Sequence, residues 1–187
     1  MTQAGGGYTP AEREHRHHGW DRPGSEPMTE PDDPGPDRPS IEVLVSDEQP
    51  IRLSHDALTR ALEAGCEALH APAGASISLL LTDAPGIARL KREAFGVEAA
   101  TDILSYPLDG FAPTEAGGHL IGDLVLCPEV AVRQAAALGR PADEEVLELL
   151  AHGLLHLAGR DHADPEAEVA MAIEQRELAG AMRRGHV

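Results

Sequence analysis

The 187-residue chain is long enough for one domain with a substantial core, because 42% of its residues are hydrophobic. Its formal net charge of −17 excludes a long-range attraction to nucleic acid, so any RNA contact would need a local basic patch. The sequence has no apolar run of the roughly 18 residues that span a membrane, and its first residues do not resemble a signal peptide. We therefore expect a cytoplasmic protein with no membrane partner.

Residues 1–39 are predicted to form a disordered tail. They hold seven of the 15 prolines and have almost no periodic apolar pattern, so they cannot bury enough surface to fold. Residues 40–187 keep −13 of the net charge and are expected to form the single folded domain. Cys66 and Cys127 each lack a second cysteine at metal-ligand spacing. Both are expected to be buried, reduced thiols.

Hydrophobic periodicity predicts alternating strands and helices after the tail. Strands are expected at residues 41–45, 77–82, 101–106 and 119–127. Helices are expected at about residues 55–70, 83–95, 128–138, 141–158 and 165–183. Ser54 and Asp83 are the expected N-caps of the first two helices, Gly96 follows the second helix, and Pro107 is expected to end the third strand. The order predicts a single α/β (α+β) domain with a mixed four-stranded sheet and about five helices.

Three closely spaced histidines give the strongest functional signal. His152 and His156 are four residues apart on a predicted helix, so they project from one face and can bind the same ion. Gly159 lies where the helix can end in a left-handed turn, which lets His162 reach that ion from the following loop. Three histidines with an open fourth position are typical of catalytic zinc. We predict one zinc ion here, in a metalloenzyme domain; histidines with only structural roles are the alternative.

The same spacing is that of zinc peptidases, His-Glu-x-x-His-x-x-Gly-x-x-His. Gly153 occupies the position of the glutamate that takes a proton from the zinc-bound water in those enzymes. A zinc hydrolase that acts on a peptide or small amide therefore needs a carboxylate from elsewhere in the chain. Asp123 and Glu129 are the candidates for that role.

Residues 152–162 match, at every fixed position, a signature similar to that of the YbeY family, His-Gly-x-Leu-His-Leu-x-Gly-x-Asp-His. Leu90 followed by residues 101–107 resembles the family's Leu-Asn…Thr-Asp-Val-Leu-Ser-Phe-Pro segment. Residues 122–127 are similar to its Gly-Asp-Ile-x-Ile strand. The three stretches follow the family's order and cover most of residues 41–165, whereas the tail falls outside the resemblance.

The resemblance implies a single α/β domain with zinc on the three histidines. It implies an endoribonuclease that cleaves single-stranded RNA, acts in maturation of the 3′ end of small-subunit 16S rRNA and in ribosome quality control, and contacts the ribosome or ribosomal proteins. A ribosome assembly factor with mainly structural zinc is the non-catalytic alternative, which the acidic charge mildly favours. The sequence assigns no oligomeric state.

One departure from the family pattern concerns the phosphate contact. The family usually has an arginine five residues after the position of Leu90, and this chain has Phe95 there. Arg92, one turn earlier on the predicted helix, is the candidate replacement, because a guanidinium matches phosphate oxygens in pairs. A solvated surface role for Arg92 is the alternative. Lys91 stands in place of the family's asparagine and adds a cation nearby.

The sequence allows two roles for each of three further polar residues. Asp102 and Ser105 could line the active cleft or make hydrogen bonds at a strand end. Asp161 could orient a histidine ligand or cap the turn after Gly159.

Overall fold

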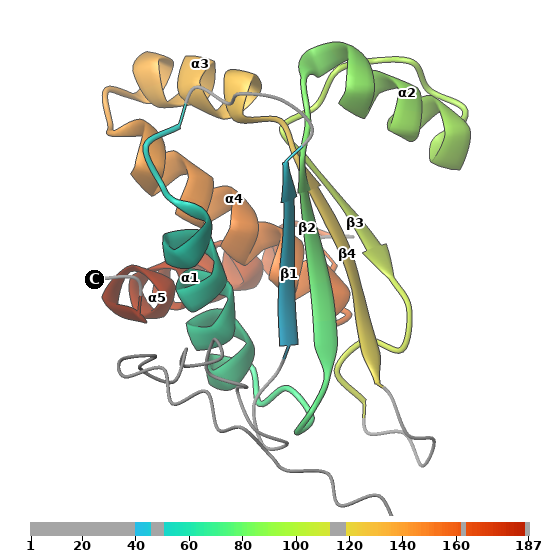
Figure 1. Ribbon diagram of the computed structural model, residues 1–187. Coiled ribbons are helices and arrows are strands. Elements are labelled where there is room, and N and C mark those ends of the chain that lie inside the picture. Colours follow the sequence, from blue (N-terminus) through green and yellow to red (C-terminus); the bar gives the residue numbers. More distant parts are fainter. Residues whose placement is uncertain (1–39, 46–50, 113–118, 162–163, 186–187) are drawn as a thin grey trace, which may run out of the picture. The chain divides into compact units, whose positions relative to one another are not determined.

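The computed structural model describes residues 40–45, 51–112, 119–161 and 164–185. The predicted tail and the third predicted zinc ligand, His162, lie outside these ranges. All described residues belong to one compact unit, Pro34–Val187. Figure 1 shows its elements in chain order: β1 (Ser40–Val45), α1 (His55–Ala68), β2 (Ser76–Leu81), α2 (Ala84–Phe95), β3 (Ile103–Pro107), β4 (Leu120–Leu126), α3 (Pro128–Leu138), α4 (Ala142–Leu157) and α5 (Pro165–Gly185).

The sheet is mixed, with the strand order β1-β2-β4-β3. β1, β2 and β4 run parallel, and β3 pairs with β4 in the antiparallel direction at the edge of the sheet. The predicted α/β class is therefore confirmed. The third strand ends at Pro107, as expected, and Pro107 itself is the last residue of β3 and pairs with Gly122. Proline is compatible with an edge strand, since its missing N–H can face away from the partner strand.

The main core fills the space between the sheet and helices α1, α4 and α5 (Figure 1). Leu79 of β2 and Leu124 and Leu126 of β4 point toward these helices and are completely buried. Val125, one position along β4, lies in a second, smaller cluster with Ile87 of α2. The side chains of successive β4 residues thus point to opposite faces of the sheet, and α2 covers the face away from α4.

Local signals place the helix ends. The Ser54 hydroxyl accepts a hydrogen bond from the Ala57 N–H at 3.2 Å, and the Asp83 carboxylate accepts one from the Gly86 N–H at 2.8 Å. Both residues are therefore the N-caps that the sequence predicts. Gly96 ends α2 with a left-handed backbone at φ 72°. Such a φ strains residues with a Cβ, so glycine suits this position.

The two cysteines are buried and make no disulfide, as expected. Burial raises the pKa of the Cys66 thiol to about 12, so this thiol stays protonated at neutral pH.

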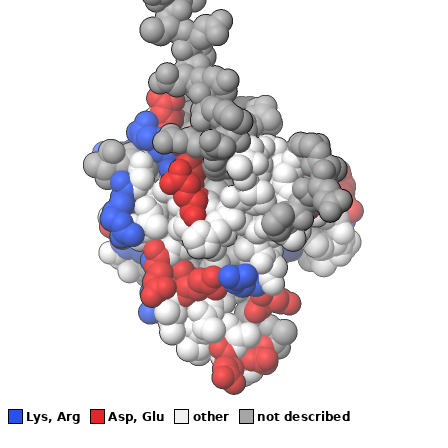
Figure 2. Space-filling model, turned by 90° about the horizontal axis from the view of Figure 1, so that it is seen from below, with Lys and Arg blue, Asp and Glu red and all other residues white. Residues whose placement is uncertain are grey.

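None of the helices in the described part of the chain is long and apolar enough to cross a membrane. Figure 2 views the end of the domain opposite α2 and α3, and acidic side chains gather in a band on this face.

Candidate functional site

Helix α4 carries the predicted histidine pair through the centre of the domain. Asp143, Glu144 and Glu145 lie in its first turn, where the helix dipole favours negative charge. Most of its later residues are buried between the sheet and the neighbouring helices, as expected for a helix that is apolar nearly all round. His152 and His156 are only half-buried and lie one turn apart, so they form a polar strip on an otherwise buried helix.

The two imidazoles converge on one point. His152 Nε2 and His156 Nε2 lie 3.0 Å apart, and the rings are nearly perpendicular, at 84°. Two nitrogens that bind the same tetrahedral zinc at about 2.0–2.1 Å lie roughly 3.3 Å from each other. The spacing of this pair is thus close to that of two ligands of a single ion. It confirms that the two side chains share one face of the helix.

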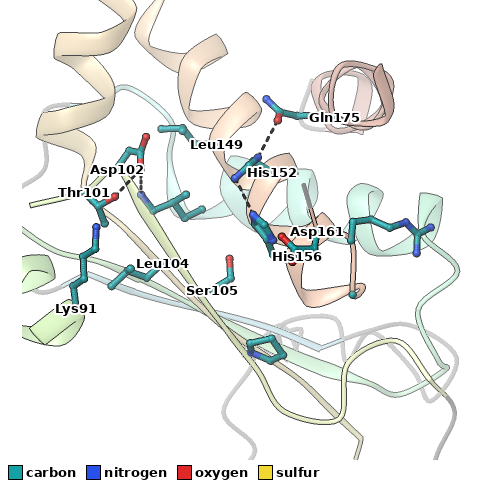
Figure 3. Close-up of a pocket in the computed structure, with 14 residues that line it drawn as sticks. Lys91, Thr101, Asp102, Leu104, Ser105, Leu149, His152, His156, Asp161 and Gln175 are labelled. Carbon is teal, nitrogen blue, oxygen red and sulfur yellow. Dashed lines mark hydrogen bonds between the residues drawn. The ribbon is translucent and has the colours of Figure 1, made fainter. Parts of the chain in front are cut away.

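Helix α5 sets the orientation of His152. The Nδ1 atom of His152 lies 3.1 Å from the Gln175 Oε1 atom (Figure 3). The Gln175 amide in turn donates to the Glu148 carboxylate at 3.1 Å. Because an amide oxygen can only accept, Nδ1 of His152 is the donor in this contact, which leaves Nε2 of a neutral imidazole as the acceptor nitrogen. Such a partner behind a histidine is typical of metal sites, where it selects the tautomer. A cation between the two Nε2 atoms could accept a lone pair from both of these nitrogens.

The chain turns sharply after α4. Gly159 has a left-handed backbone at φ 77°, and the Arg160 N–H donates to the Leu155 carbonyl at 2.9 Å. This is the turn that the sequence predicts between His156 and His162. His162 lies outside the described residues, and among those that are described there is no group of three or more His, Cys, Asp or Glu side chains able to hold a metal. The three-histidine zinc site stays a prediction.

The histidine pair opens into a cleft of about 850 Å³ that crosses the free edge of β3. Figure 3 places Lys91 of α2 across the cleft from His152 and His156, with Ser105 of β3 between them. The cleft draws its walls from α2, β3, α4, α5 and the connecting loops: Lys91, Thr101, Asp102, Ile103, Leu104, Ser105, Pro107, Leu149, His152, His156, Gly159, Arg160, Asp161 and Gln175.

Asp102 and Ser105 both line the cleft, and Asp102 also makes the hydrogen bonds expected at the end of a strand. Ser105 Oγ donates to the Gly153 carbonyl at 3.2 Å and ties β3 to α4. Burial raises the pKa of Asp102, but hydrogen bonds from Gln134, the Ile103 N–H and Thr101 outweigh it and hold the pKa below its usual range. A carboxylate with this many donors is a weak base.

Gly153 allows α4 to approach the sheet closely. A Cβ atom at this position would lie 2.8 Å from Ile103 Cδ1 and from Leu124 Cδ2. The residue is buried, so it points into the contact between helix and sheet. A glutamate here would have no room, which gives a packing reason for the glycine at the position of the peptidase glutamate.

The two cations of α2 are placed differently. Arg92 makes an ion pair with Glu98 at 3.1 Å, its side chain is half-exposed, and it is not among the described residues that line the cleft. Lys91 does line the cleft. Gln175 and Glu148 are site residues that sequence reasoning missed. Gln175 reaches His152 only through the packing of α5 on α4, which no local pattern marks. Glu148 lies one turn before His152 on α4 and takes part by accepting a hydrogen bond from Gln175.

Fold and site together define a class: an α/β protein with a helix-borne histidine pair at a sheet-edge cleft. A family model described as Endoribonuclease YbeY matches residues 44–183. The Endoribonuclease YbeY of Beutenbergia cavernae is 37% identical over 138 residues, which cover 72% of this chain and 92% of that protein. That of Renibacterium salmoninarum is 38% identical over 142 residues, 74% of this chain and 90% of that protein. The chain belongs to the YbeY family.

The solution structure of TM1509 from Thermotoga maritima has the same fold. It matches with a TM-score of 0.54 and 21% sequence identity, over 76% of this chain and 88% of that one.

Proposed function

We propose that this chain is a zinc-dependent endoribonuclease that cleaves single-stranded RNA. Its role would be the maturation of the 3′ end of small-subunit 16S rRNA and ribosome quality control, in contact with the ribosome or ribosomal proteins. Family membership supports this reading, because the relatives are named endoribonucleases. The observation that carries it is the convergence of His152 Nε2 and His156 Nε2 at 3.0 Å beside a cleft that contains Lys91.

His152 and His156 would hold the zinc ion, with His162 as the third ligand that the sequence predicts. When bound, zinc supplies a Lewis acid and lowers the pKa of water, which suits the hydrolysis of a phosphodiester. Gln175, as the acceptor from Nδ1, would favour the tautomer of His152 that binds the ion through Nε2. Lys91 lines the cleft as one phosphate contact. Arg92 remains the second proposed phosphate contact, and it would have to leave Glu98 to reach the RNA.

Two alternatives predict different results. Peptide or amide hydrolysis needs a carboxylate base, but Asp123 accepts a hydrogen bond from Ser78 and Glu129 pairs with Arg133. Neither belongs to the set of described residues around the cleft. The other alternative, an assembly factor with structural zinc, predicts normal RNA processing without a functional histidine pair.

The test compares His152→Ala and His156→Ala with the wild type in three measurements: bound zinc, cleavage of single-stranded RNA, and cleavage of casein. His55→Ala is the matched control, since His55 is an exposed histidine at the start of α1. We expect both site variants to lose zinc and RNA cleavage while remaining folded, with no casein cleavage by any of the proteins. If folded His156→Ala still cleaves RNA at the wild-type rate, the catalytic role is refuted. If it no longer binds zinc but processes 16S rRNA normally in cells, the assembly-factor alternative is favoured.

A further inference from the structure

Two aromatic rings pack together where α2 meets the edge of the sheet. Phe95, the last residue of α2, and Tyr106 of β3 lie with their ring centroids 6.1 Å apart and their planes 15° from parallel. The Tyr106 hydroxyl donates to the Leu90 carbonyl at 3.4 Å, which fixes the direction of its ring. Phe95 is 57% exposed although it is a large apolar residue. The pair therefore presents an aromatic face of fixed orientation to solvent.

This aromatic pair adjoins the cleft on two sides. Lys91, which lines the cleft, is one turn before Phe95 on the same face of α2. Tyr106 lies between Ser105 and Pro107, which both line the cleft. Successive residues of a strand point to opposite faces, so Tyr106 faces α2 while Ser105 faces α4. Because β3 is an edge strand, a chain that crosses this edge would contact both faces.

We propose that Phe95 and Tyr106 form a stacking platform for an unpaired nucleobase of the RNA. The inference rests on the proposed function and adds a binding subsite to it. One base stacks on the exposed face of Phe95, and Tyr106 supports the ring from behind. The adjacent phosphate passes Lys91, and the backbone continues over β3 toward His152 and His156. Aromatic side chains bind bases of single strands in this way without sequence preference, because every base has a π-face.

The charge distribution favours RNA over a protein partner at this surface. Helix α2 carries Arg89, Lys91 and Arg92 against the single acid Glu93, in a chain with a net charge of −17, and Glu98 just beyond its end is paired with Arg92. Lys91, which lines the cleft, is the local cation that RNA binding by an acidic protein requires. A platform also explains single-strand specificity, since bases in a duplex are stacked on their neighbours and cannot reach Phe95.

The test measures binding of a fluorescently labelled single-stranded RNA by anisotropy, with chelator present to prevent cleavage. Phe95→Leu keeps an apolar side chain but removes the aromatic face, and Phe95→Trp restores one. We expect Phe95→Leu to weaken binding by about 5- to 150-fold, the range for loss of one base–aromatic stack. Phe95→Trp should bind like the wild type. Leu138→Ala, at an exposed apolar residue of α3, is the control and should bind like the wild type.

A second measurement asks whether the ring and a base interact directly. Abasic sites are placed one at a time along the RNA, and binding is compared between the wild type and Phe95→Leu. One position should weaken binding to the wild type but not to Phe95→Leu. If the wild type binds RNA and Phe95→Leu binds equally well with no such position, the platform is refuted and the nuclease proposal stands. If the wild type binds no single-stranded RNA, both are refuted. If the coupling is found but zinc-loaded protein cleaves nothing, the platform stands and the nuclease proposal fails.

Discussion

Substitution of Gly153 by alanine tests whether close packing of α4 on the sheet positions the histidine pair. The added Cβ would lie 2.8 Å from Ile103 Cδ1 and Leu124 Cδ2, and 3.2 Å from Ser105 Oγ. Overpacking of this kind costs about 1–3 kcal/mol. Alanine gains about 1 kcal/mol over glycine inside a helix. We therefore expect Gly153→Ala to lower the free energy of unfolding by about 1 kcal/mol.

Gly180 of α5 offers the matched control, because a Cβ there would meet only Arg184 Nη1, at 3.7 Å. Gly180→Ala should raise the free energy of unfolding by about 0.5–1 kcal/mol. With a urea m-value of about 2 kcal/mol/M, the unfolding midpoints of the two variants should move in opposite directions, by roughly 0.5 M each. A midpoint for Gly153→Ala that rises as much as that of Gly180→Ala would refute the packing argument.

Two other predictions concern the surroundings of the histidine pair. Gln175→Met removes the acceptor from His152 Nδ1 and should weaken zinc binding about 10- to 100-fold in a chelator competition. The control Ile173→Met, at an exposed residue, should leave the zinc affinity unchanged. If Gln175→Met also leaves it unchanged, Gln175 does not orient the ligand. Asp102→Asn should lower the free energy of unfolding most above about pH 4. The pKa of Asp102 is lower in the folded than in the unfolded protein, so the ionised carboxylate stabilises the fold above the unfolded-state pKa. This contribution is lost as the pH falls through the folded-state pKa. Urea unfolding of both proteins between pH 2 and 7 checks this, and a stability gap that widens toward low pH would contradict it.

Local patterns were sufficient for the elements and their ends. Ser54 and Asp83 are N-caps because their side chains need only the next turn of the chain, and the left-handed turn at Gly159 is accompanied by hydrogen bonds to the preceding helical turn. The same holds for the spacing of His152 and His156 on one helix face.

Contacts between elements could not be predicted in the same way. Gln175 lies 23 residues from His152 along the chain and reaches it only because α5 packs on α4. The choice between Lys91 and Arg92 depends on how α2 is set against β3, which no periodicity specifies. The sequence pattern shows only that Gly153 stands where a peptidase has glutamate, whereas its packing role depends on Ile103 and Leu124 from two different strands.

The unequal burial of α4 and α2 implies that the two sides of the cleft differ in their local stability. Helix α4 has buried residues along nearly its whole length, whereas in α2 only Gly86 and Ile87 are buried. Segments with few buried contacts open at low free energy, while central helices exchange their amide hydrogens only on global unfolding. The histidine side of the cleft should thus keep its geometry as long as the domain is folded. In the proposed complex with RNA, adjustment to chains of different shape would then come from α2, through small movements of Lys91 and Phe95 opposite the fixed side that carries His152 and His156.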